Sequence, residues 1–258
     1  MYLKNLFSLV LLTFLSISLF AQKGNRDFYE LRIYHIENAN QESQIDSYLE
    51  KALLPALHRN GIAKVGVFKP IASQADAGKK VYVFIPYSSM GVYSEMEGKL
   101  AKDQIYQTAG SAYINAPFDN PPYQRIETAF LQAFTGHPRF TASNLTGPKK
   151  DRVYELRSYE SPTEKLYKQK VRMFNEGEMD IFTKLDFNPV FYGEVIAGAS
   201  MPNLMYMTTF SNMESRDAHW DKFRSDPDWE RMKVMPEYQN IMNKNDQRLL
   251  YPAEYSGF

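Results

Sequence analysis

The stretch Phe28-Tyr-Glu-Leu-Arg-Ile-Tyr34 decides the fold, because it returns later in the chain as Val153-Tyr-Glu-Leu-Arg-Ser-Tyr159. The second copy keeps Tyr-Glu-Leu-Arg and the final Tyr. A repeat of this kind indicates a duplicated structural unit. Three further pairs follow in the same order: Tyr87-Ser-Ser-Met90 with Phe210-Ser-Asn-Met213, Asp103-Gln-Ile-Tyr106 with Asp226-Pro-Asp-Trp229, and Arg125-Ile126 with Arg248-Leu249. The sequence therefore predicts two units, residues 22–140 and 152–258, joined by a linker at 141–151.

Each unit is predicted to run strand, helix, two strands, helix, strand. The Tyr-Glu-Leu-Arg blocks alternate like strands, and apolar residues between 45 and 57 recur with a helical period that Pro55 should interrupt. This order is the split βαβ pattern of ferredoxin-like folds, in which helices cover one sheet face. Two copies can bury the uncovered faces against each other. We expect an α+β molecule in which tandem ferredoxin-like units form a pseudo-dimeric α/β barrel.

The chain resembles the NIPSNAP family. The resemblance lies in both Tyr-Glu-Leu-Arg blocks, in Leu54-Pro-Ala-Leu-His-Arg-Asn-Gly61, in Asp226-Pro-Asp-Trp229 and in the ending Leu249-Leu-Tyr-Pro-Ala-Glu-Tyr-Ser256. It implies a dimeric α/β barrel, here assembled within one chain. Proteins with similar barrels include cofactor-free monooxygenases, haem-degrading enzymes and binders without chemistry. The fold therefore does not choose the function.

The N-terminal residues predict a secretory signal peptide at 1–21. Lys4 precedes an uncharged run from Leu6 to Phe20, and the small residue Ala21 comes before a polar stretch. This run is shorter than the ~20 residues that a membrane-spanning helix needs. We expect a periplasmic or secreted protein with no membrane segment after cleavage. A buried N-terminal helix and an uncleaved anchor are the alternatives.

Composition narrows the classes of function. The 30 Lys and Arg balance the 30 Asp and Glu, so no basic surface for nucleic acid is expected. The chain has no Cys, which excludes thiol catalysis, thiolate metal sites and disulfides. A small-molecule ligand and assembly into a homo-oligomer stay open as partners.

The first strands supply the candidate ligand-binding residues. Alternation places Tyr29, Leu31 and Ile33 on one face of the first strand. We expect this apolar face to meet the helices, so that the other face lines the barrel interior with Glu30, Arg32, Tyr34, Glu155, Arg157 and Tyr159. The alternative is a structural network in which Glu and Arg pair with each other, as buried charges must.

Histidine offers only weak candidates for catalysis. His58 and His219 could act as acid or base, or as an axial ligand of haem. No His spacing typical of zinc sites occurs, so we expect no metal and, haem apart, no cofactor. Asp226-Pro-Asp-Trp229 is interpreted as a helix start, with Asp226 as the cap.

These observations favour a protein that binds a small apolar or aromatic molecule in an interior barrel cavity. The first alternative is a cofactor-independent monooxygenase or isomerase that uses His58 or a tyrosine. The second alternative is a structural or partner-binding protein without a ligand.

Overall fold

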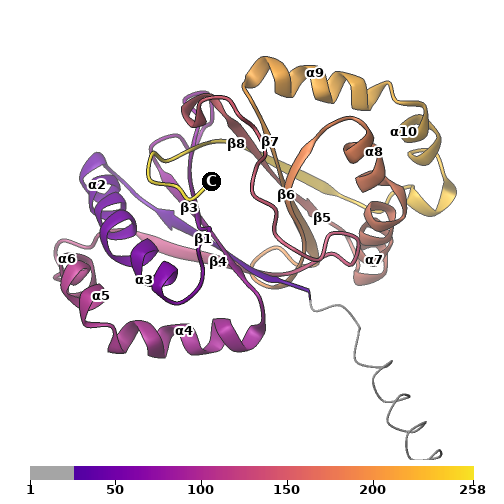
Figure 1. Ribbon diagram of the computed structural model, residues 1–258. Helices are drawn as coiled ribbons and strands as arrows, with labels where there is room; N and C mark the ends of the chain where they lie inside the picture. The colour runs from indigo at the N-terminus through magenta and orange to yellow at the C-terminus, as the bar shows by residue number, and fades with distance from the viewer. Residues whose placement is uncertain (1–25) are drawn as a thin grey trace, which may run out of the picture.

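A closed barrel of antiparallel strands forms the centre of the computed structural model, which describes residues 26–258 (Figure 1). The predicted signal peptide lies outside the described residues. The strand order is β1-β3-β2-β8-β5-β7-β6-β4. The first half of the chain contributes β1 (Phe28–His35), β2 (Gly66–Pro70), β3 (Lys80–Tyr87) and β4 (Arg125–Ala133), and the second half contributes β5 (Val153–Glu160), β6 (Asn188–Ala197), β7 (Asn203–Phe210) and β8 (Lys244–Pro252). The halves join at the β2–β8 and β4–β6 pairs.

The helices of the two halves lie on opposite sides of the barrel (Figure 1). Those of the first half are α2 (Ala39–Tyr48), η1 (Leu49–Leu53), α3 (Leu54–Arg59), α4 (Met90–Lys102), α5 (Gln104–Ala109) and α6 (Ser111–Ile114). After the short turn η2 (Lys149–Asp151), those of the second half are α7 (Glu164–Met173), η3 (Phe174–Glu178), α8 (Met179–Lys184), α9 (Met213–Arg224), α10 (Pro227–Met232) and η4 (Pro236–Tyr238). No helix within residues 26–258 is long and apolar enough to cross a membrane.

The first long helix of the first half passes through the π-helical turn η1, whereas the corresponding helix of the second half is kinked at η3, where the backbone of Gly177 is not helical. In the first half α3 starts directly after this turn, with Pro55 in its first turn, where the missing N–H is not needed. Matching side chains also start the later helices. Ser89 caps α4 and Asn212 caps α9, while Asp103 caps α5 and Asp226 caps α10. The two halves can therefore be compared position by position.

The barrel interior is filled with apolar side chains, and this corrects the predicted orientation of the first strands. Tyr29 and Leu31 point inward, where Tyr29 packs against Phe191 of the second half at 5.4 Å between ring centroids. The opposite face, with Glu30, Arg32 and Tyr34, meets the helices, and so does the face with Glu155, Arg157 and Tyr159. Alternation was predicted correctly, but the inward face was not. The charged face can meet helices because its Glu and Arg side chains neutralise each other.

Glu194 of β6 ties the first residues of the described chain to the second half. Its carboxylate accepts hydrogen bonds from Arg26 Nη1 at 3.2 Å and from the Tyr167 hydroxyl at 3.2 Å, and it pairs with Lys168. Burial would raise the pKa of Glu194, but Lys168 and Arg26 outweigh it and hold this pKa below its ordinary value. The native state therefore binds the proton less readily than the unfolded chain does.

We expect Glu194→Gln to lower the free energy of unfolding by about 1 kcal/mol at pH 7. The contribution of a carboxyl with a depressed pKa is present above its unfolded value, near 4.3, and is lost as pH falls through the lower folded value. The difference between wild type and variant should thus shrink as pH is lowered from about 5 to about 3 in urea unfolding. Glu95→Gln, at an exposed pair with Lys99, should change stability at neither pH. A difference that stays constant with pH would contradict this assignment.

Candidate functional site

An ion pair between the buried Glu30 and the partly exposed Arg32 stands on the helix-facing side of β1. Arg32 donates from Nε and Nη2 to Glu30 Oε1, at 2.8 and 2.7 Å, and the Tyr87 hydroxyl donates to Glu30 Oε2 at 3.0 Å. Burial would lower the pKa of Arg32, but Tyr34 and Glu30 hold it well above its ordinary value. The Arg32 guanidinium therefore stays charged and is held against the Glu30 side chain.

A pocket of about 420 Å³ opens above this pair, between the sheet and the helices of the first half. Such a volume suits a small organic molecule. Its walls come from the end of α2, from η1, from β3 and from α4 to α6, and they are mostly aromatic and aliphatic: Tyr48, Leu53, Tyr87, Tyr93, Met96, Leu100, Tyr106 and Ile114. Burial raises the pKa of Tyr48, Tyr87 and Tyr106, so these phenols stay protonated at neutral pH. They can donate hydrogen bonds but are poor bases.

The π turn η1 helps to shape this pocket. Tyr48 ends the regular helix before the turn, and Leu53 ends the turn itself. The Tyr48 hydroxyl is 2.9 Å from the Tyr106 hydroxyl, which links the turn to α5. α5 is held in turn by its cap Asp103, whose carboxylate pairs with Arg59 at 2.5 Å. π turns are common beside functional sites because they displace side chains from the regular helical path.

The corresponding place in the second half is filled. Glu155 is fully buried and accepts from Arg157 Nε at 2.6 Å, from Arg216 Nε at 2.7 Å and from Trp220 Nε1 at 2.7 Å. The Trp220 ring lies on the Arg157 guanidinium, with 4.0 Å between Cζ and the ring centroid. Side chains of the protein itself thus supply the hydrogen-bond donors and the stacking partner of this ion pair, in the place where a pocket lies in the first half.

The helix position that holds Trp220 accounts for part of the difference between the halves. Trp220 is the eighth residue after Asn212, the cap of α9, and the eighth residue after Ser89, the cap of α4, is Glu97. Glu97 is exposed and lines the pocket. The first half therefore keeps open the volume that an indole ring fills in the second half.

The other predicted site residues are not all brought together. Arg32 Nη1 is 3.4 Å from the Tyr34 hydroxyl, and Arg157 Nη1 is 3.4 Å from the Tyr159 hydroxyl, so each tyrosine supports its arginine. His58 is exposed on α3. The His219 ring contacts the Ser215 carbonyl oxygen through Nδ1 at 2.6 Å.

Neither histidine lines the pocket above Glu30, so neither is placed to ligate a group bound there. Among residues 26–258, no cluster of three or more His, Asp and Glu side chains is arranged to hold a metal ion.

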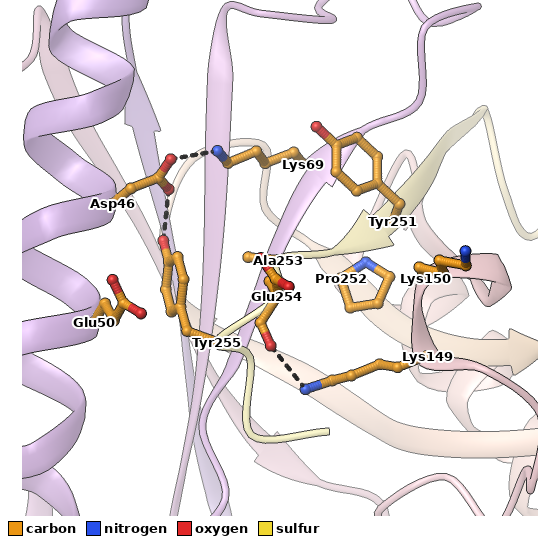
Figure 2. Close-up of a pocket in the computed structure, with 10 residues that line it drawn as sticks. All are labelled: Asp46, Glu50, Lys69, Lys149, Lys150, Tyr251, Pro252, Ala253, Glu254 and Tyr255. Atoms are coloured by element: carbon orange, nitrogen blue, oxygen red, sulfur yellow. Dashed lines mark hydrogen bonds and ion pairs between the residues drawn. The ribbon is translucent and has the colours of Figure 1, made fainter.

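A larger groove of about 900 Å³ lies between α2, η1 and the chain after β8 (Figure 2). Its charged groups bind mainly to other groups of the protein. Asp46 accepts from Lys69 Nζ at 2.6 Å and from the Tyr255 hydroxyl at 2.6 Å, and Lys149 Nζ lies 3.4 Å from the Glu254 carbonyl oxygen (Figure 2). These contacts anchor the last residues of the chain against the first half.

Comparison with known proteins agrees with this architecture. Residues 154–257, which make up almost all of the second half of the chain, match the family model described as NIPSNAP. A search of curated proteins found no significant match.

Solved structures of similar fold extend over most of the chain. A proposed monooxygenase from Lactobacillus acidophilus has 13% identity and a TM-score of 0.57, covering 88% of this chain and 94% of its own. A proposed monooxygenase from Fusobacterium nucleatum has 8% identity and a TM-score of 0.58, covering 89% and 93%. An anthrone oxidase-like protein has 7% identity and a TM-score of 0.54, covering 90% and 93%. At these identities the likeness concerns the fold alone, which is that of the dimeric α/β barrels.

Proposed function

We propose that this NIPSNAP-domain protein binds a small, largely apolar or aromatic molecule in the first-half pocket above Glu30 and Arg32. The proposal moves the expected site from the barrel interior to the space between sheet and helices. One observation carries it: the same ion pair is enclosed by Arg216 and Trp220 in the second half but faces a cavity of about 420 Å³ in the first. A wall of aromatic and aliphatic side chains on which polar groups converge is typical of ligand sites.

Native mass spectrometry of protein purified from its own host tests this function. We expect a small molecule at one per chain, released on denaturation. Ser94→Trp should remove it, because Ser94 lines the pocket on α4. The neighbouring Glu95→Trp should retain it, because Glu95 does not line the pocket and is largely exposed. A protein that stays empty in the host and after incubation with aromatic molecules would refute the proposal and favour a partner-binding role.

A second candidate function is cofactor-independent oxygenation or isomerisation in the same pocket. It is favoured by the whole-chain likeness to two proposed monooxygenases and an anthrone oxidase-like protein. The proton acceptor would be Glu30, since His58 lies elsewhere and burial raises the pKa of Tyr48, Tyr87 and Tyr106, which stay protonated. Oxygen uptake in the presence of the released ligand, abolished by Glu30→Gln, would support this candidate. A ligand that stays chemically unchanged in air would reject it.

We also propose that each half is a ferredoxin-like unit and that the protein is exported after removal of residues 1–21. The first proposal is supported by the order β4-β1-β3-β2 in one half and β8-β5-β7-β6 in the other. The second rests on the apolar run from Leu6 to Phe20. A mature protein from the host that starts at Gln22 would support export, whereas an intact N-terminus on a cytoplasmic protein would reject it.

A further inference from the structure

We propose that the first-half pocket takes a planar, uncharged aromatic ligand that stacks on the Arg32 guanidinium and donates an N–H or O–H hydrogen bond to Glu30. This inference rests on the proposed function, since it specifies the ligand of the same pocket. The second half of the protein contains a side chain that serves as a stand-in for such a ligand. In the second half, the Trp220 side chain holds the position that the ligand would hold in the first.

The stand-in shows which contacts the site offers. The Trp220 ring lies 4.0 Å from Arg157 Cζ, within the range of cation–π attraction, and its Nε1 donates to Glu155 Oε2 at 2.7 Å. Both contacts involve the pair that corresponds to Arg32 and Glu30. A planar ring with one donor at its edge can therefore satisfy both members of such a pair at once.

The first half leaves these two contacts available. The Arg32 side chain retains 24% exposure, against 12% for Arg157. Glu30 Oε2 accepts one hydrogen bond, from Tyr87, whereas Glu155 Oε2 accepts two. A carboxylate has acceptor sites for about four hydrogen bonds, so Glu30 can receive another donor.

The charged side chains around the pocket favour a neutral ligand. Glu30 offsets Arg32 at the floor of the pocket, and Glu97 adds a negative charge at its rim. An anionic ligand would meet net repulsion, and a cation would compete poorly with Arg32 for Glu30. A neutral heteroaromatic or phenolic molecule suits the site because its ring interacts with the guanidinium and its polar hydrogen with the carboxylate.

The first test compares indole with 1-methylindole, which has the same ring but no N–H. Both are titrated by NMR into the full mature chain after removal of any passenger. We expect indole to bind at least about tenfold more tightly, as loss of one hydrogen bond to a charged group implies. Equal affinities would overturn the inference. They would leave the proposed function standing if the Ser94→Trp variant still loses the natural passenger.

The second test rebuilds the stand-in with Glu97→Trp. The chain has two tryptophans, Trp220 and Trp229, both in the second half, so a third indole N–H signal reports on the new side chain. We expect this N–H to exchange slowly with solvent and the variant to lose indole binding. In the control Glu95→Trp, the new N–H should exchange fast and indole should still bind. Fast exchange in Glu97→Trp together with retained indole binding would overturn the proposal.

Discussion

Replacing Glu155 with Gln is expected to destabilise the protein by about 3–5 kcal/mol, whereas Glu30→Gln should cost about 1 kcal/mol. Glu155 is fully buried and is the shared partner of Arg157 and Arg216, so its loss leaves the Arg157 guanidinium without its counter-charge in a poorly hydrated place, while Arg216 keeps its second partner Asp217. The Arg32 side chain faces a pocket that water can enter. Urea unfolding of the two isosteric variants measures the difference directly.

The same pair of variants separates a structural role from a binding role. Glu30→Gln should weaken ligand binding while the protein stays folded, and Glu155→Gln should lower stability in both the presence and the absence of ligand. Equal losses of stability would contradict the asymmetry of the two halves. They would show that the Glu30 pair is as strongly desolvated as the Glu155 pair.

The architecture could largely be foreseen from the sequence, because strand alternation and the repeated blocks are local patterns. The orientation of the first strands could not. Both faces of β1 are buried, one by the other half of the barrel and one by helices, so alternation alone does not identify the interior. The expectation that the apolar face meets the helices failed because Glu30 and Arg32 form their own ion pair, which lets the charged face lie against helices instead.

The candidate site was predictable in part. Glu30 and Arg32 belong to the repeated block and were identified from it. The pocket wall on α4 was missed, because an empty volume depends on which side chain fills it and leaves no periodic pattern. Aligning the two halves at Ser89 and Asn212 would have paired Glu97 with Trp220, which was the available signal.

A second large effect is expected at the buried pair of Lys170 and Glu178. Their charged atoms are 2.7 Å apart, and the two side chains keep 6% and 3% exposure. The Lys170 ammonium also lies 4.7 Å from the centre of the Phe174 ring. Removal of either partner leaves an uncompensated buried charge, so Lys170→Ile or Glu178→Leu alone should cost about 3–5 kcal/mol of unfolding free energy.

The double variant should recover most of that loss. At the corresponding positions of the first half, Ile45 precedes the π turn η1 and Leu53 ends it, and both side chains are buried. Lys170→Ile with Glu178→Leu places the same two apolar residues at the corresponding positions around η3. Well-packed apolar replacements of buried ion pairs are often neutral or stabilising. A double-mutant cycle by urea unfolding should give a coupling energy of about 2 kcal/mol or more. Additive losses would instead mean that η3, unlike η1, depends on its ion pair, and that the packing around the two turns is not interchangeable.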